Sequence, residues 1–400
     1  MCILKRIILA LYYRTYIYPR LLVALLLCIL FKVKKGRVIF WSTIGKDYSC
    51  NPLYISNYIL DNENDDFDVY WLYKKNLDKR VFDPRIKVVK YGSLMHLYIM
   101  QTAEFLVTNH RTSTKAMLWI KRAKQKYIMT WHGSMALKKI EKDAIQSLGS
   151  QYEKFARKDS ENCSLMLSDS EWFTHLLRNS FWYNGEILQE GMPRNDIFYY
   201  KDKHADIRAK VADKLNISNH SDKIIILYAP TFRTDHGTSQ YILKWGQIKA
   251  EIESVLKRDV IVLMRLHPTL LGIVDTQDLI SEDFVRNASC YESIQELLVA
   301  SDILITDYSS TMFEFALLKK PCFLYTPDAK SYDRGFYFPI EDLPFPSSLT
   351  ENSLANNIIT FNSDTYFKNV DLFMNKTFNV KGNGHASEKV VLWMKNNHGC

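Results

Sequence analysis

Side chains that could bind phosphate or transfer a proton follow four apolar segments of this sequence. The four polar segments are 130–134 (TWHGS), 229–233 (APTFR), 265–268 (RLHP) and 307–310 (DYSS). His132 stands beside a glycine, where the backbone can approach a ligand closely, so it is a candidate general base. Arg233, Arg265 and His267 could hold phosphate oxygens through charge-assisted hydrogen bonds. For any one of these residues a structural role is the competing interpretation, and the set gains weight only if the fold brings its members together.

The segment after residue 302 combines a short strand with a helix start. Ile303–Thr306 is apolar and predicts a buried strand, which a polar turn and a helix follow. We expect Ser309 or Ser310 to cap this helix and Glu314 to lie near the end of its first turn. Hydroxyl and free N–H groups at a helix start bind anions, most often phosphate. An ordinary capped turn between a strand and a helix, which binds nothing, is the alternative.

Apolar strand-like segments alternate with helical patterns through most of the chain. Strands are expected at 37–41, 68–73, 86–90, 104–108, 126–130, 164–167 and 187–189, and again at 223–228, 260–264, 284–285, 303–306 and 322–325. Helices are expected at 52–60, 93–102, from about 113, at 245–256 and at 293–300. This alternation predicts parallel sheets covered by helices on both faces, with the polar segments at the carboxyl ends of the strands. The polar stretch around 201–222 separates the two series, and the lack of GxGxxG and GxxxxGKS/T motifs disfavours a dinucleotide site or a P-loop.

Composition limits the class of protein and its partners. The chain has 400 residues, of which 47% are hydrophobic and 24% charged, and this predicts a globular protein of two domains. A net charge of +8 favours anionic partners such as a nucleotide or a lipid surface. Nucleic acid is not expected, because no motif that interleaves aromatic and basic residues is present.

Neither cysteines nor carboxylates indicate a metal centre. The cysteines form no CxxC pair, so neither a zinc site nor a disulfide framework is predicted and a reducing compartment fits. They are Cys2, Cys28, Cys50, Cys163, Cys290, Cys322 and Cys400. Asp307 has no second carboxylate beside it, so we expect no metal and expect arginine, histidine and a helix dipole to neutralise charge.

The first 36 residues are apolar and basic and are expected to associate with a membrane. The apolar run 21–31 is shorter than the roughly 20 residues that span a bilayer, and Arg14, Pro19 and Arg20 interrupt the sequence before it. Flanking basic residues are Lys5, Arg6, Arg14 and Arg20 on one side and Lys32, Lys34, Lys35 and Arg37 on the other. We therefore expect a monotopic anchor at an anionic cytoplasmic leaflet. The alternatives are one tilted or re-entrant helix over about 17–33, a buried helix, and a signal peptide, although no small-x-small cleavage pattern follows the run.

Six motifs occur in an order that is typical of one family. They are TWHG (130–133), GMPRND (191–196), YAPTFR (228–233), RLHP (265–268), TDYSS (306–310) and YDRG (332–335). Over roughly 40–343 the sequence resembles the CDP-glycerol glycerophosphotransferase family of teichoic acid and capsule synthesis. The resemblance implies an α/β protein of GT-B type, with two Rossmann-like domains facing a cleft, nucleotide bound mainly by the C-terminal domain, and peripheral attachment to the inner face of the cytoplasmic membrane. The expected domains are 1–36, 37–215 on the acceptor side and 216–400 on the donor side, with the last helix free to pack back on the N-terminal domain.

The resemblance also implies roles for residues in the matching motifs. His132 resembles the catalytic base, and His267 resembles a ligand of the donor phosphates at the catalytic site. The other residues with implied roles are Asp307, Ser309 and Ser310 in the donor-binding turn, Arg233 in the PTFR motif, Glu314 for ribose hydroxyls, and Arg194 and Asp196 for fixing a hinge.

The reaction implied by the resemblance transfers glycerol phosphate from CDP-glycerol to a hydroxyl of a membrane-linked glycan or polyol-phosphate acceptor and releases CMP, without a metal or other cofactor. Because 400 residues leave no room for a large extra acceptor domain, a primase or small capsule transferase is expected rather than a long-chain polymerase. The alternatives among enzymes are a CDP-ribitol phosphotransferase and a GT-B glycosyltransferase that uses a nucleotide sugar. The alternative outside enzymes is a non-catalytic binder of nucleotides or nucleic acid at a membrane surface.

Overall fold

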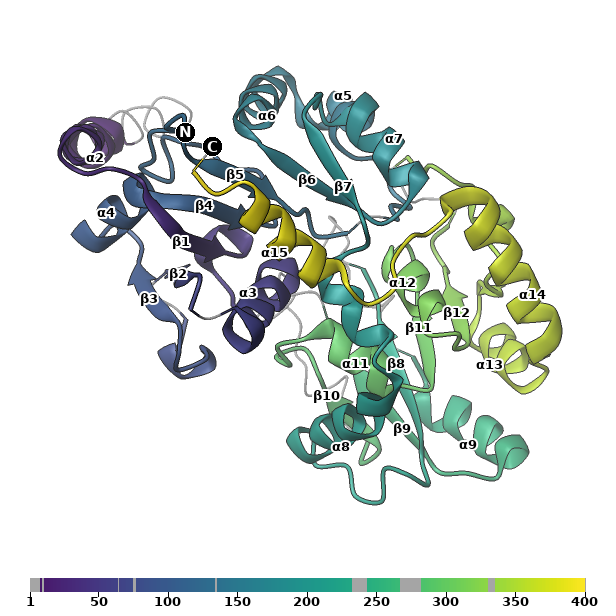
Figure 1. Ribbon diagram of the computed structural model, residues 1–400. Helices are drawn as coiled ribbons and strands as arrows, with labels where there is room; N and C mark the ends of the chain where they lie inside the picture. Colours follow the sequence, from purple (N-terminus) through teal and green to yellow (C-terminus); the bar gives the residue numbers. More distant parts are fainter. Residues whose placement is uncertain are drawn as a thin grey trace. The chain divides into compact units, whose positions relative to one another are not determined.

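The computed structural model describes residues 8, 11–63, 65–74, 77–133, 135–231, 243–266, 282–329 and 335–399 (Figure 1). The chain divides into two compact units. Unit 1 contains residues 1–134, 141–196 and 381–400, and unit 2 contains residues 135–140 and 197–380. Residues 197–215 group with unit 2, ahead of the expected boundary at 216. Residues 381–400, which include the last helix, group with unit 1, the N-terminal side on which that helix was expected to be free to pack.

Unit 1 is built on a seven-stranded sheet whose paired strands are all parallel. Its strands are β1 (Lys34–Trp41), β2 (Asp68–Tyr73), β3 (Lys87–Lys90), β4 (Ala103–Thr108), β5 (Lys126–Met129), β6 (Leu165–Ser168) and β7 (Glu186–Gln189). They lie in the order β3-β2-β1-β4-β5-β6-β7. The strand order therefore reverses between β1 and β4: β2 and β3 lie on one side of β1, and β4 to β7 lie on the other. In parallel sheets, ligands bind outside the carboxyl ends of the strands at such a reversal.

Most helices of unit 1 connect these strands, whereas α2 precedes β1 and α15 comes at the end of the chain. They are α2 (Tyr18–Leu30), α3 (Cys50–Asn62), α4 (Leu94–Thr102), α5 (Ile145–Leu148), α6 (Ser150–Asn162), α7 (Glu171–Ser180) and α15 (Ala386–Asn396). Ser93 caps α4 and Ser170 caps α7, because each hydroxyl accepts the N–H of the third residue along. The helix expected from about residue 113 is wrong: residues 114–118 form turns, and Leu118 adopts a left-handed backbone (φ 54°) that ends any helical hydrogen-bond pattern.

Unit 2 repeats the architecture on a six-stranded parallel sheet in the order β10-β9-β8-β11-β12-β13. The strands are β8 (Ile224–Ala229), β9 (Val260–Met264), β10 (Val285–Asn287), β11 (Ile303–Thr306), β12 (Cys322–Tyr325) and β13 (Ser347–Ser348). The helices are α8 (His204–Lys214), α9 (Trp245–Leu256), α11 (Ile294–Ala300), α12 (Thr311–Leu317), α13 (Glu351–Ile359) and α14 (Ser363–Phe373). On one face of this sheet, apolar side chains of β8, β9 and β11 pack with α9 and α13 in a single core cluster. Two Rossmann-like units with parallel sheets are therefore confirmed.

The GMPRND motif holds the last helix of the chain. Both carboxylate oxygens of Asp196 accept hydrogen bonds at the start of α15, from Ala386 N at 2.9 Å and from Ser387 N at 2.8 Å. A carboxylate at this position satisfies amides that have no partner within the helix. Asp196 thus fixes α15, which packs against α3, in unit 1.

The apolar N-terminal segment forms one helical stretch, with a π-helical turn at Tyr13–Ile17 that continues into α2. Arg14, Pro19 and Arg20, which interrupt the apolar sequence, do not interrupt this helical stretch. Within the described residues, Tyr13–Leu30 is the one helix that is long and apolar enough to cross a membrane, judged by length and composition alone. Ile17 packs in one cluster with Leu97 of α4, the helix beside α2 in Figure 1.

Candidate functional site

His132 lies in a tight turn directly after β5, at the carboxyl edge of the unit 1 sheet. The preceding residue, Trp131, adopts a left-handed backbone (φ 56°) that turns the chain sharply at this point. His132 is exposed to solvent on part of its surface, and its Nδ1 lies 3.1 Å from the carbonyl oxygen of Asn109. Its ring stacks on that of His110, with centroids 4.5 Å apart and planes 11° apart. The turn thus presents an imidazole that the protein orients and that solvent can reach.

The surroundings of this imidazole disfavour its protonation. Desolvation by the surrounding protein, followed by the charges of His110 and Arg194, lowers the pKa of His132, while the bond to the Asn109 carbonyl raises it. A carbonyl oxygen only accepts hydrogen bonds, so Nδ1 of His132 carries the hydrogen and Nε2 carries the lone pair. Nε2 has no hydrogen-bond partner in the part of the chain that the structure describes. A neutral imidazole with an open Nε2 is suited to accept a proton.

Asn51 ties the turn to two other parts of unit 1. Its side chain is fully buried in the first turn of α3. Nδ2 donates to the carbonyl of Trp131 at 3.0 Å, and Oδ1 accepts the backbone N–H of Arg194 at 3.0 Å. A Cβ at Gly133 would meet the Arg194 guanidinium only at 3.9 Å, an ordinary contact, so the fold itself has room for a side chain at this position.

Asp307 lies at the carboxyl edge of the unit 2 sheet, directly after β11. Its buried carboxylate accepts hydrogen bonds from the backbone N–H groups of Thr231, at 2.9 Å, and of Tyr308, at 2.6 Å. Thr231 follows the neighbouring strand β8, so the carboxylate joins the ends of two adjacent strands. Asp307 therefore fixes the backbone at Thr231, in the described part of the APTFR segment.

The two serines of the turn have different partners. Ser309 Oγ accepts the N–H of Thr311 at 3.3 Å and bonds to the Thr311 hydroxyl at 2.9 Å, whereas Ser310 occupies the N-cap position without a side-chain cap. Ser310 Oγ instead accepts the N–H of Leu137 at 3.2 Å. Glu314 is buried in α12, and Gln295 Nε2 lies 3.5 Å from its carboxylate. The turn is thus held by bonds within unit 2.

Arg265 supports a loop. Its Nη1 donates to the carbonyls of Tyr291, at 2.7 Å, and of Ala288, at 3.2 Å, just beyond β10. Desolvation lowers the pKa of Arg265 to about 10, so the guanidinium remains charged at neutral pH. The other two residues expected to hold phosphate, Arg233 and His267, lie outside the described residues.

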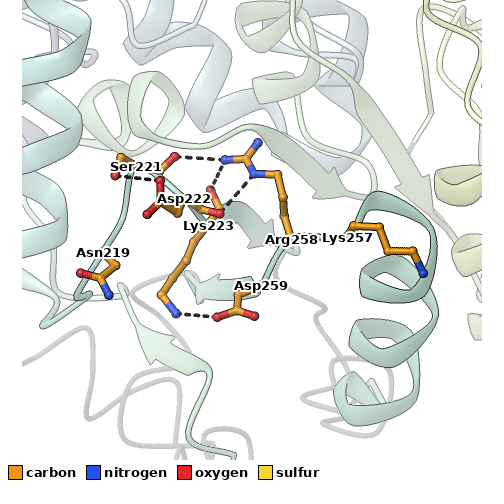
Figure 2. A pocket seen from close by; sticks show the side chains of 7 residues that line it. All are labelled: Asn219, Ser221, Asp222, Lys223, Lys257, Arg258 and Asp259. Carbon is orange, nitrogen blue, oxygen red and sulfur yellow. Dashed lines mark hydrogen bonds and ion pairs between the residues drawn. The ribbon is translucent and has the colours of Figure 1, made fainter.

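A pocket at the opposite end of the unit 2 sheet offers a poorer site. Asn219, Ser221, Asp222, Lys223, Lys257, Arg258 and Asp259 line it near the amino ends of β8 and β9 (Figure 2). Lys223 pairs with Asp259 at 3.2 Å, and the guanidinium of Arg258 donates to three backbone carbonyls. These charges are satisfied by one another and by the backbone, so the pocket offers little to an anion. Across the described ranges no group of three histidine, cysteine, aspartate or glutamate side chains could hold a metal ion.

Sequence reasoning missed Asn51, Asn109 and His110. Asn109 and His110 directly follow β4, as the other polar segments follow their strands, so their position after the apolar segment 104–108 is the signal that could have identified them. Asn51 gives no such signal, because its role depends on contacts with Trp131 and Arg194, residues far away in the sequence.

Two Rossmann-like units with polar groups at the carboxyl edges of parallel sheets define an α/β protein of GT-B-like architecture. The family model described as CDP-Glycerol:Poly(glycerophosphate) glycerophosphotransferase matches residues 22–394, and the chain belongs to this family. The resemblance seen in the motifs is thereby confirmed.

Named relatives agree with this membership. The chain is 34% identical over 373 residues to a teichoic acid poly(glycerol phosphate) polymerase of Bacillus subtilis, covering 90% of this chain and 48% of that protein, so it spans about half the length of that relative. It is 31% identical over 369 residues to a protein of the same name from Bacillus spizizenii, covering 88% of this chain and 90% of that protein. A solved structure of a histidine-to-asparagine variant of the wall teichoic acid polymerase TagF matches with a TM-score of 0.79 and 30% identity, covering 91% of this chain and 89% of that one.

The relative from Bacillus spizizenii tests the expectation that 400 residues are too few for a polymerase. It is named a polymerase, and this chain covers nine-tenths of it. A chain of about this size therefore suffices for a protein of that name, and the expectation that length disfavours a polymerase is wrong.

Proposed function

We propose that this chain transfers glycerol phosphate from CDP-glycerol to a hydroxyl of a glycerol phosphate polymer or lipid-linked glycan and releases CMP, in the synthesis of teichoic acid or a capsular polymer. The observation that carries the proposal is the oriented, neutral imidazole of His132 at the carboxyl edge of the unit 1 sheet. Family membership supports the donor and the polymer acceptor, and solved TagF structures include one soaked with CDPG.

In this reaction His132 is the general base. Its Nε2 takes the proton of the acceptor hydroxyl while that oxygen forms a bond to the distal phosphorus of CDP-glycerol. The bond between this phosphorus and the bridging oxygen breaks, CMP leaves with the electron pair, and His132 later releases its proton to solvent. Positioning and charge stabilisation supply most of the rate enhancement in phosphoryl transfer, so the orientation of the imidazole matters as much as its basicity.

We assign the donor to the carboxyl edge of unit 2. Asp307 orders the backbone at Thr231, and Arg265 orders the loop at Ala288 and Tyr291, so these residues act by shaping the backbone around the nucleotide. Direct contacts to the diphosphate are assigned to Arg233, His267 and the hydroxyl and N–H groups at Ser309 and Ser310. Glu314 is assigned to the ribose hydroxyls, and the reaction is proposed to need no metal.

We place the protein at the cytoplasmic face of the membrane through α2. Large apolar side chains are exposed on α2 and at the start of α4: Leu22, Leu25, Leu26, Ile29 and Leu30, with Leu94 and Met95. Leu94 is 76% exposed and Ile29 is 73% exposed, which would be costly in water and is favourable in a lipid interface. Lys32, Lys34 and Lys35 directly follow α2 and would attract anionic headgroups.

The test is CMP release from CDP-glycerol by the purified full chain with a lipid-linked acceptor, with and without EDTA. We expect acceptor-dependent release that EDTA does not change and that His132→Ala abolishes. Full turnover by His132→Ala would remove the assignment of the base. Loss of turnover in EDTA, restored by a divalent cation, would remove the assignment of a metal-independent reaction.

A ribitol donor is the second candidate, because the chain is also 31% identical over 281 residues to a teichoic acid ribitol-phosphate primase of Bacillus spizizenii. The same assay with CDP-ribitol and with nucleotide sugars, read by mass spectrometry of the acceptor, distinguishes these donors. Binding of nucleotide or nucleic acid without release of CMP from any donor would favour a non-catalytic binder.

A further inference from the structure

We propose that Asn109 is a positioning residue that sets the tautomers of two stacked imidazoles, His110 and His132, and that His110 keeps His132 available as a base. The effect on rate rests on the proposed function above, whereas the tautomers are a property of the folded chain alone. We call His110 and His132 the histidine pair.

One residue holds both members of the pair. The backbone oxygen of Asn109 lies 3.1 Å from Nδ1 of His132, and its side-chain Oδ1 lies 2.8 Å from Nδ1 of His110. The two rings are nearly parallel, with centroids 4.5 Å apart. Because each ring meets Asn109 through Nδ1, both Nε2 atoms lie on the sides of the rings that face away from Asn109.

The hydrogen-bond donors follow from the partners. The backbone N–H of Thr43 donates to Asn109 Oδ1 at 3.0 Å, which identifies that atom as the oxygen of the amide. An amide oxygen only accepts, so His110 Nδ1 carries a hydrogen, as His132 Nδ1 does against the backbone carbonyl. In their neutral forms both imidazoles therefore carry the lone pair on Nε2.

The surroundings of the pair disfavour its protonation. Desolvation lowers the pKa of His110, with Asp47 raising it and Lys46 lowering it. The pKa of His132 is lowered as well, and the charges that act on it in that direction belong to His110 and Arg194. Two imidazoles in contact titrate as a coupled unit, because a proton on one disfavours a proton on the other. His110 thereby keeps His132 neutral over a wider range of pH.

The loop that carries Asn109 is anchored on both sides. Thr43 holds its side chain, and two residues further on the buried guanidinium of Arg111 pairs with Glu141 at 2.8 Å and with Asp159 at 3.2 Å. An oriented group on a supported backbone keeps the geometry that proton transfer needs. Residues of unit 1 therefore hold the loop that positions the histidine pair.

The first experiment measures the tautomers in the full chain labelled with 15N-histidine, by two-bond 15N–1H correlation without donor or acceptor. Signals are assigned by their loss in His110→Gln and in His132→Gln. At a pH where both rings are neutral, we expect each to carry hydrogen on Nδ1 and none on Nε2. An Nε2–H tautomer for either ring overturns the proposal.

The second experiment compares the pH dependence of kcat/KM for CMP release. His110→Phe keeps a flat ring that cannot be protonated. Without the repulsion from a protonated His110, the pKa of His132 rises. Protonated His132 cannot accept a proton, and the acidic limb of the profile therefore moves to higher pH. Asn109→Ala keeps the backbone oxygen that faces His132 but removes Oδ1, which holds His110 and accepts the Thr43 N–H. It is therefore expected to lower kcat through displacement of His110 and of the loop, and Asn109→Asp, which keeps an acceptor oxygen, to recover most of the loss. His175→Phe, at an exposed histidine of α7, is the control and should leave both quantities unchanged.

The outcomes separate this inference from the proposed function. An unmoved acidic limb in His110→Phe, or an unchanged kcat in Asn109→Ala, overturns the role of the pair in the reaction. If the unmodified chain releases no CMP from any donor, the proposed function fails, and the tautomer measurement still decides whether Asn109 sets the pair.

Discussion

The carboxyl edges of the two sheets use polar side chains in different ways. At the edge of unit 1, His132 and His110 are held through Nδ1 alone and leave Nε2 without a partner among the described residues. At the edge of unit 2, Asp307 and Arg265 direct their charged groups at backbone amides and carbonyls of their own unit. Polar residues at equivalent places in two similar sheets thus have different partners.

The difference follows from what each edge has to do. A group that transfers a proton must keep one atom open to the substrate, and the protein can orient it only through its other atoms. A surface that binds a diphosphate can use backbone N–H groups, and side chains then serve best by fixing the loops that carry those amides. Unit 1 has the features of the first kind of edge and unit 2 those of the second. Substitutions at the two edges should therefore change different quantities: kcat at the edge of unit 1 and the KM for the donor at the edge of unit 2.

The largest expected effect is at His132. Removing a general base costs typically 10²–10⁴-fold, so His132→Ala should lower kcat by that factor while the KM for CDP-glycerol changes little. His132→Gln, which restores bulk without a base, should be equally slow. A small fall in kcat with a large rise in KM would assign His132 to donor binding. The two edges would then not differ in function as proposed.

The second prediction concerns the buried ion pairs of Arg111, which follow the histidine pair's loop in unit 1. Arg111 is buried between Glu141 and Asp159, so Arg111→Met would leave two buried carboxylates without their cation and should cost about 3–5 kcal/mol of stability. The matched control is Arg157→Met, because Arg157 pairs with Glu153 at the exposed surface of α6, where such pairs contribute about 0–1 kcal/mol.

Urea unfolding followed by tryptophan fluorescence measures both changes. Equal shifts in the two variants would show that the buried cluster does not support this part of unit 1. A larger shift in Arg111→Met with little change in the pH profile of the surviving folded protein would show that the cluster stabilises the unit without orienting the histidine pair.

The third prediction concerns Asp307. Asp307→Ala removes the carboxylate that accepts the N–H groups of Thr231 and Tyr308, and hydrogen bonds to a charged group are worth about 1.5–3 kcal/mol each. Because the loss acts on the loop proposed to hold the donor, the KM for CDP-glycerol should rise by roughly 10-fold or more while kcat changes less. Asp307→Asn keeps one acceptor oxygen, so its KM for CDP-glycerol should lie between those of the unmodified chain and of Asp307→Ala. A fall in kcat without a change in KM would place Asp307 in the chemical step.

Sequence periodicity predicted most strands of both units because buried parallel strands are continuous apolar segments, and β9, β11 and β12 begin and end as expected. It failed at residues 113–118, where a left-handed Leu118 ends the helical turn. His132 could be singled out because a histidine after a strand is visible in the chain. The partners of Arg265 could not, since the carbonyls of Ala288 and Tyr291 reach it only after β9 and β10 have paired.

The smallest expected effect distinguishes the two serines of the unit 2 turn. Ser310 Oγ accepts the N–H of Leu137, from the short segment 135–140 that belongs to unit 2, so Ser310→Ala removes one hydrogen bond worth about 0.5–1.5 kcal/mol. Ser309→Ala removes only local bonds to Thr311 and should cost less stability. If the hydroxyls also contact the donor, each variant will raise the KM for CDP-glycerol beyond what its stability loss explains. If only Ser310→Ala lowers stability and neither variant changes KM, the hydroxyls do not contact the donor, and any contact between the turn and the diphosphate is made by its backbone.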